Sequence, residues 1–116
     1  MHELSLCQSA IELIEQQVGG QSVHRVVAVW FEAGAGACIE EDAIRFAFDC
    51  ASQGTLLEGA QVHFKLLPAR AWCWNCEKTV EIKSYGAACP HCQKGSLKLD
   101  DTSSGMEFKV KQIEVE

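Results

Sequence analysis

The alternation of hydrophobic and polar positions predicts two helices and a buried strand in the first half of the chain. Apolar side chains recur every three or four positions over residues 4–18, and Gly19-Gly20 follows them, which is typical of an amphipathic helix with a glycine C-terminus. Residues 23–32 are β-branched, aromatic and almost continuously apolar, which favours a buried central strand. Acidic residues then precede an apolar stripe and predict a second helix over residues 40–52, stopped near Gly54.

Two later segments alternate between apolar and polar residues, which is the period of a strand with one solvated face. The first covers residues 61–66, and Pro68 marks its end or an edge position. The second follows a polar loop at residues 100–105 and resumes at Met106. Its phase shifts near Lys111-Gln112, so we expect a closing strand with a bulge there.

Residues 70–99 have a different character, because they contain four of the seven cysteines, two of the three tryptophans and little helical periodicity. Material of β-α-β type flanks this segment on both sides. The simplest architecture is therefore α+β, with two helices packed on a small three-stranded mixed sheet and an inserted zinc-ribbon module with four cysteines. We expect residues 1–69 and 100–116 to form one discontinuous domain and residues 70–99 to form the other.

The composition further limits the class of protein to which the chain can belong. A chain of 116 residues with 47% hydrophobic and 22% charged residues suits one ordinary domain, or a small domain with a metal-held module. The longest apolar run, residues 26–31, has six residues, too few to cross a membrane. The N-terminus lacks the basic and small-residue features of a secretory signal, so we expect a cytoplasmic protein. The net charge of −6 has the wrong sign for a general binder of nucleic acid or anionic membranes.

The cysteines of the module form two C-x-x-C pairs, separated by the twelve residues 77–88. Two such pairs can close a tetrahedral shell of four thiolates around Zn²⁺, with bonds of about 2.3 Å. A closed shell leaves no position for substrate or water, so zinc would be structural rather than catalytic. A thiol oxidoreductase would need a thioredoxin-like strand and helix around one pair, which is missing here. The predicted zinc ligands are Cys73, Cys76, Cys89 and Cys92.

A zinc-ribbon module that binds nucleic acid or protein is the alternative function. Five basic and two acidic residues give residues 70–99 a charge of +3, and four thiolates with one Zn²⁺ lower it to about +1. The module contains Trp72, Trp74 and Tyr85, which could stack on bases. We expect them instead in the small core of the module or in its contact with the sheet domain.

The first three residues, Met1-His2-Glu3, would ordinarily form a frayed end. Their chemistry is nonetheless specific. A planar set of four metal ligands can form at this end of the chain. It would consist of the α-amine, the amide nitrogen and the imidazole of His2, and either the amide nitrogen or the carboxylate of Glu3. Such a nitrogen-rich set selects Ni(II) or Cu(II) over zinc, and its affinity should fall as the pH falls.

These features together resemble the HypA/HybF family of hydrogenase maturation nickel metallochaperones over essentially the full chain, and the HybF type most closely. The resemblance is carried by the opening residues 1–7, the stretches 25–30 and 38–48, and the C-W-x-C and C-P-x-C pairs. It implies a carrier rather than an enzyme, with a nickel-binding domain and a zinc ribbon. It also implies delivery of Ni(II) to the large subunit of a [NiFe] hydrogenase, together with a GTPase partner.

By position, the resemblance makes His2 the essential nickel ligand, with Glu3 beside it, and makes the four module cysteines the zinc ligands. Glu40 falls where some members have a carboxylate proposed to approach nickel. The chain departs from the family at residues 33–37, where a bulkier residue is usual, so we expect a looser loop here. The gap between the cysteine pairs is too short for an inserted histidine that reaches nickel in some members, and we do not assign that role to His91.

The other cysteines, Cys7, Cys38 and Cys50, are expected to be buried and inert. His24 and His63 are expected to be solvent-facing or hydrogen-bonded rather than metal ligands. The sequence does not determine the oligomeric state, so a monomer and a homodimer are both retained as alternatives.

Overall fold

The computed structural model describes residues 2–99 and 107–116, and the chain divides into two compact units. Unit 1 comprises Met1–Glu32, Ile39–Lys65 and Lys109–Glu116, and unit 2 comprises Ala33–Cys38 and Leu66–Phe108. Unit 2 therefore includes more of the chain than the module predicted over residues 70–99. Whether the two predicted domains fold independently stays a prediction.

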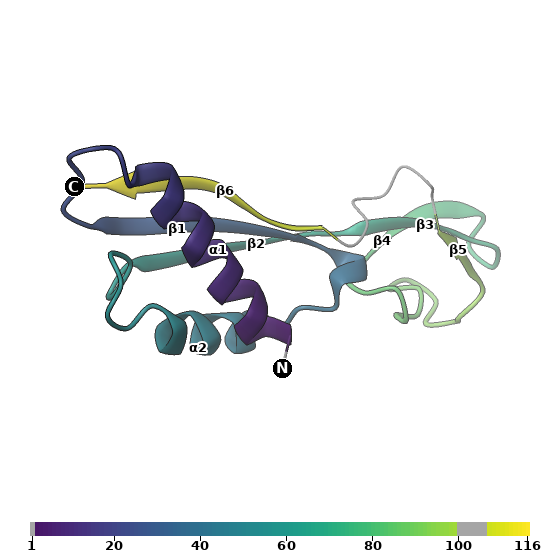
Figure 1. The fold of residues 1–116 in the computed structure, drawn as a ribbon. Helices are drawn as coiled ribbons and strands as arrows, with labels where there is room; N and C mark the ends of the chain where they lie inside the picture. Colours follow the sequence, from purple (N-terminus) through teal and green to yellow (C-terminus); the bar gives the residue numbers. More distant parts are fainter. Residues whose placement is uncertain (1, 100–106) are drawn as a thin grey trace. The chain divides into compact units, whose positions relative to one another are not determined.

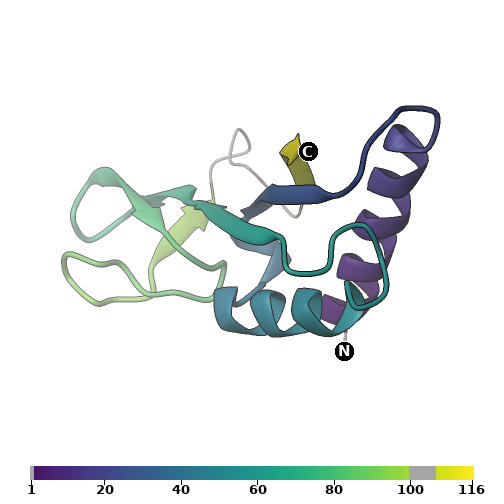
Figure 2. The ribbon, with the colours of Figure 1, turned by 90° about the vertical axis from the view of Figure 1, so that its left-hand side faces the viewer.

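Unit 1 is built on a three-stranded sheet in the order β2-β1-β6, with strands β2 (Gln61–Leu67), β1 (Val26–Gly34) and β6 (Phe108–Val115). Helices α1 (His2–Val18) and α2 (Glu41–Ala51) lie on the same side of this sheet (Figures 1 and 2). Strands β1 and β2 run in the same direction, and β6 runs in the opposite one. The antiparallel pairing of β6 with β1 extends beyond the two strands, because the amide of Glu116 donates to the carbonyl of Arg25 at 2.9 Å. The predicted α+β architecture with a mixed sheet is confirmed.

The core of unit 1 lies between the helices and the sheet. Phe31 of β1 and Phe48 of α2 meet edge to face, with ring centroids 5.8 Å apart, an arrangement that aromatic pairs favour. The predicted stripe of α1 faces this core through positions spaced by three and four residues, namely Cys7, Ala10, Ile11, Ile14 and Val18.

Most element boundaries in unit 1 lie close to those predicted. Helix α1 begins at His2 rather than at residue 4, so the expected frayed end instead forms the first helical turn. Strand β1 ends two residues later than predicted, at Gly34, and a short 3₁₀ turn, η1 (Ala35–Ala37), follows. In β6 the exposure pattern changes phase where Lys111 and Gln112 are both exposed. The polar loop predicted at residues 100–105 and Met106 lie outside the described residues.

Unit 2 contains a second sheet, in the order β4-β3-β5, which the sequence did not predict. Its strands are β3 (Ala69–Cys73), β4 (Lys78–Ile82) and β5 (Leu97–Leu99), and β3 pairs antiparallel with both neighbours. Exposure alternates along β3, so every second residue faces inward. The buried residues of this core are small or medium in size, namely Ala35, Ala69, Ala71, Cys73, Val80, Ile82 and Cys89.

None of the helices formed by the described residues is long and apolar enough to cross a membrane.

Candidate metal centres

The four cysteines of the two C-x-x-C pairs converge on one point of unit 2. All four Sγ atoms lie within 4.8 Å of one another. The Sγ atoms of Cys73 and Cys92 are 3.7 Å apart, and those of Cys76 and Cys89 are 3.9 Å apart. A tetrahedron with metal–sulfur bonds of about 2.3 Å has edges of about 3.8 Å. The cluster therefore fits a tetrahedral zinc site.

In each pair a nearby backbone amide donates a hydrogen bond to the first sulfur. The amide of Cys76 donates to Sγ of Cys73, and the amide of His91 donates to Sγ of Cys89, both at 3.4 Å. The amide of His91 contributes to a lowered pKa of Cys89 and so favours its thiolate, which is the form that binds a metal. His91 thus contributes its backbone, and it is not part of the group of ligand atoms.

A residue with positive φ closes each turn. Glu77, with φ 54°, donates its amide to the carbonyl of Cys73, and Gln93, with φ 63°, donates its amide to the carbonyl of Cys89, both at 2.8 Å. The left-handed conformation reverses the chain immediately after the second cysteine of each pair. This repeated geometry explains how two separate segments present their sulfurs to one centre.

The thiols of the cluster differ in proton affinity. A hydrogen bond from the backbone of Lys94 lowers the pKa of Cys92 to about 6, and one from the backbone of Cys92 lowers the pKa of Cys89. The pKa of Cys76 is raised to about 12, chiefly because its side chain is hydrogen-bonded to Cys92. The cluster therefore holds both thiolates and thiols until a cation replaces the remaining protons.

The surroundings of the cluster indicate a structural role. Cys73 and Cys89 are 0% and 1% exposed, and Cys76 and Cys92 are partly buried against the same core. Four sulfur ligands complete a tetrahedral shell, so no position is open to a substrate.

The two residues predicted to bind nickel lie together at the start of α1. Nε2 of His2 is 3.6 Å from Oε2 of Glu3, and their side chains are 58% and 25% exposed. The first four amides of a helix have no acceptor within the helix, so the His2 and Glu3 amide nitrogens have no intrahelical bond to lose. The α-amine belongs to Met1, which lies outside the described residues.

Glu40 is exposed and precedes the first residue of α2 as its N-cap. Within the described residues, the four cysteines form the only group of three or more possible ligands with their atoms close together. Glu40 is therefore not gathered with His2 and Glu3 into such a group.

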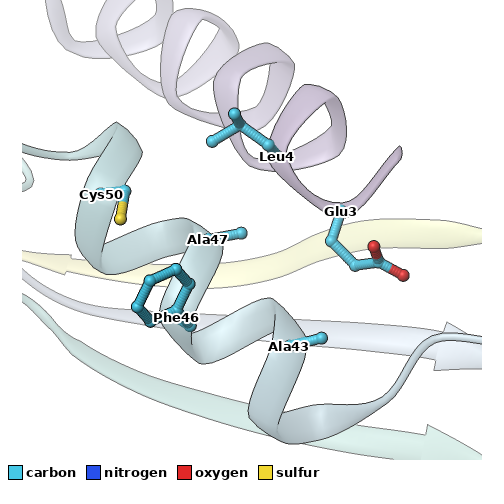
Figure 3. A pocket seen from close by; sticks show the side chains of 6 residues that line it. All are labelled: Glu3, Leu4, Ala43, Phe46, Ala47 and Cys50. Atoms are coloured by element: carbon cyan, nitrogen blue, oxygen red, sulfur yellow. The ribbon is translucent and has the colours of Figure 1, made fainter. Parts of the chain in front are cut away.

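An apolar groove lies beside Glu3, between the first turn of α1 and the outer side of α2 (Figure 3). Its volume is about 320 Å³, and its largest lining side chain, Phe46, is 72% exposed. Sequence analysis missed this feature, although an aromatic residue on the polar side of the second helix could have indicated it. One of the two candidate nickel residues, Glu3, therefore borders a nonpolar surface, lined by Glu3, Leu4, Ala43, Phe46, Ala47 and Cys50.

The three cysteines outside the cluster have different surroundings. Cys7 is fully buried, and its thiol donates to the carbonyl of Ile44 at 3.7 Å. Burial, assisted by the charge of Glu3, raises the pKa of Cys7 to about 11. The prediction of a buried, inert thiol is confirmed for Cys7 and is wrong for Cys38 and Cys50, which are exposed.

Cys38 follows the η1 turn with a positive φ, and Cys50 lies on the side of α2 that faces away from the core. His24 is exposed and lies before the start of β1. The ring of His63 stacks on Trp30, with centroids 4.5 Å apart.

Trp72, Trp74 and Tyr85 are not buried in the core of unit 2, which corrects one of the two placements expected from sequence. Trp72, Trp74 and Tyr85 are 36%, 62% and 38% exposed. Alternation along β3 places the small residues inward and Trp72 outward. Tyr85 instead packs on Gly36, where an added Cβ would lie 2.6 Å from the tyrosine Cζ.

The fold and the cysteine cluster define a small α+β protein with a zinc-ribbon-like metal-binding unit. The family model described as "Hydrogenase/urease nickel incorporation, metallochaperone, hypA" matches residues 1–115. The hydrogenase maturation factor HybF of Salmonella typhimurium is 53% identical over 116 residues, and that of Escherichia coli strain K12 is 48% identical, each covering 100% of both chains. The chain therefore belongs to the HypA/HybF family of hydrogenase maturation nickel metallochaperones, whose members are not enzymes.

Solved structures share the fold at lower identity. The solution structure of the nickel metallochaperone HypA from Helicobacter pylori aligns with a TM-score of 0.61 and 19% identity, covering 97% of this chain and 96% of the other. A second solution structure of a HypA protein aligns with a TM-score of 0.63 and 19% identity, covering 100% of this chain and 97% of the other. These likenesses support the architecture of the chain.

Proposed function

We propose that this protein carries Ni(II) at its N-terminus and delivers it to the large subunit of a [NiFe] hydrogenase, while Zn(II) stabilises unit 2. The observation that carries the proposal is the contrast between the two candidate sites. The four sulfurs form a closed cluster with two buried members. His2 is 58% exposed in the first helical turn. A carrier needs an accessible, exchangeable site, whereas a structural metal is retained in a closed one.

The nickel ligands of this proposal are the α-amine of Met1, nitrogen atoms of His2, and either the amide nitrogen or the carboxylate of Glu3. Fused chelate rings in one plane suit the square-planar preference of Ni(II). Glu3 already lies beside the imidazole, at 3.6 Å. Because the amide nitrogens must lose their protons, nickel affinity should fall as the pH falls.

The proposal includes two protein partners, a maturation GTPase and the hydrogenase large subunit, in the cytoplasm. It is supported by the names of the relatives, which are hydrogenase maturation factors. A homodimer is compatible with it. The same proposal retains residues 1–69 with 100–116 as the nickel domain and residues 70–99 as the zinc domain.

The experiment that tests the nickel role is His2→Ala in a strain that lacks its own family member. We expect hydrogenase activity to fall to the level of the deletion strain at limiting nickel and to recover in excess nickel, with zinc content and folding unchanged. The matched control is His24→Ala, because His24 is also exposed and lies outside the candidate site. Normal maturation by His2→Ala at limiting nickel would refute the proposed role of His2.

A further inference from the structure

One face of the unit 2 sheet presents two tryptophans. Cross-strand pairing places Arg70 opposite Glu81, and Trp72 opposite both Thr79 and Lys98. Residues directly opposite each other in antiparallel strands share a face. We call this surface the tryptophan face and define it by Arg70, Trp72, Trp74, Thr79, Glu81 and Lys98.

Trp74 extends this face just beyond β3. Its amide donates to the carbonyl of Ser96 at 3.1 Å, which continues the pairing along the strand. The two indole rings meet edge to face, with centroids 6.2 Å apart and an interplanar angle of 78°. This contact holds the two rings as one aromatic surface.

The tryptophan face is open although it lies on the middle strand of its sheet. Trp72 is 36% exposed and Trp74 is 62% exposed, whereas Ala71 and Cys73 on the inner face are 0% exposed. The metal cluster and its small apolar neighbours fill the inner face, so the tryptophans are not needed for that core. Exposed tryptophans are enriched among residues that dominate the binding energy of protein interfaces.

Charges on the tryptophan face favour a particular partner. Lys98 lies directly opposite Trp72 on one side, and Arg70 precedes Trp72 by two positions on the same strand. Glu81, the acidic residue of this set, lies opposite Arg70. With Glu81 opposite Arg70, the face carries a net charge of +1, and its cation beside the tryptophans is Lys98. An aromatic surface beside a cation complements apolar side chains that have carboxylates beside them.

A nucleic acid fits this surface less well than a protein segment does. Aromatic stacking on bases would suit the tryptophans. However, the chain carries a net charge of −6, and residues outside 70–99 account for −9, which opposes a phosphate backbone. A short acidic peptide brings far fewer charges near the acidic remainder of the chain.

We propose that the tryptophan face binds an extended segment of a partner protein in which carboxylates flank apolar side chains. This recognition uses neither His2 nor Glu3 and does not require nickel. A failure of the nickel proposal would therefore leave it unaffected, and its own failure would leave the nickel proposal unaffected.

The test uses the zinc-loaded full chain, immobilised, and two pools of short synthetic peptides. The apolar positions are randomised identically in both pools, and the charged positions are all Asp or Glu in one pool and all Lys or Arg in the other. A single-stranded thymidine oligonucleotide of about fifteen nucleotides serves as the third probe. The variants are Trp74→Ala and Lys98→Glu, with Trp30→Phe as the matched control because Trp30 belongs to unit 1. Zinc content verifies that each variant retains unit 2.

We expect the acidic pool to be retained about tenfold more than the basic pool, and Trp74→Ala to remove most of that retention. Lys98→Glu should lower retention of the acidic pool and raise that of the basic pool, while Trp30→Phe should change neither. The proposal would be overturned if the two pools were retained equally, if neither pool were retained, or if the oligonucleotide were retained in preference to both. Unchanged retention by both unit 2 variants would also overturn it.

Discussion

At the scale of single residues, the seven cysteines acquire their roles from their surroundings. Four share one cluster, and Cys7 lies in a buried environment that raises its pKa to about 11. Cys38 and Cys50 are exposed. The spacing of the two C-x-x-C pairs was sufficient to predict the cluster, because each pair is a local turn. Burial of an isolated cysteine depends on contacts with distant segments, so the sequence could not separate Cys7 from the other two.

We predict three stages of thiol alkylation for the zinc-loaded protein, measured as mass increases with iodoacetamide near pH 8. The native protein should take up two adducts, at Cys38 and Cys50. A chelator should raise the number to six by releasing the cluster, and a denaturant should raise it to seven by exposing Cys7. Because the pKa of Cys7 is raised to about 11, its thiolate stays a minor form at pH 8.

Peptide mapping identifies the modified residues at each stage. Modification of Cys7 before unfolding would contradict the burial described for it. Rapid modification of the cluster without a chelator would contradict a closed metal site.

A second prediction at this scale concerns Gln93, which has φ 63°. Gln93→Gly should leave the stability of unit 2 unchanged or raise it slightly, because glycine adopts this conformation without steric cost. Gln93→Val should lower the free energy of unfolding by about 1–2 kcal/mol, because a β-branched residue is disfavoured there. Chemical denaturation of the zinc-loaded variants measures both effects. Thr79→Val serves as the control in an exposed strand position, and an equal cost for valine at both positions would refute the conformational explanation.

At the scale of secondary structure, elements with a long periodic pattern were predictable and short ones were not. Helix α1 spans seventeen residues, so its stripe recurs several times. Strands β3 and β4 have five residues each and β5 has three, which is too short for a clear alternation. In addition, β3 buries alanines and a cysteine while it exposes Trp72. Side-chain size alone therefore does not identify the buried face of β3.

The contacts of the segment after β1 illustrate the same limit. Ala35 belongs to the core of unit 2, and Tyr85 packs on Gly36. Both contacts join residues that are far apart in the sequence. Composition located the cysteine-rich module but could not show that the segment after β1 packs with it.

At the scale of the whole molecule, the two units depend on different sources of stability. Unit 1 has large buried side chains such as Phe31 and Ile44. The core of unit 2 consists mainly of alanines, cysteines and medium-sized apolar residues. Cys73 and Cys89 belong to it, and Cys76 and Cys92 pack against it. Small cores of this kind depend on a metal or a disulfide.

We therefore predict that removal of the metal unfolds unit 2 while unit 1 stays folded. After treatment with a chelator, amide hydrogen exchange should lose its protection in β3 and β4 and keep it in α1 and β1. Restoring Zn(II) should restore the protection, because metal binding supplies folding free energy. A variant with serine in place of all four cluster cysteines should match the chelated protein. Simultaneous loss of protection in both units would show that they fold as one.

The central claim is that the free N-terminus binds nickel separately from the zinc cluster, and one measurement tests it most directly. Ni(II) is titrated calorimetrically into zinc-loaded protein that begins at Met1 and into protein with one extra residue before Met1, and zinc is quantified in both. We predict one equivalent of Ni(II) for the first protein. We predict at least about tenfold weaker binding for the second, because the extension removes the terminal amine from the ligand set, and one equivalent of zinc in both. One equivalent of Ni(II) bound with unchanged affinity by the extended protein would contradict the claim.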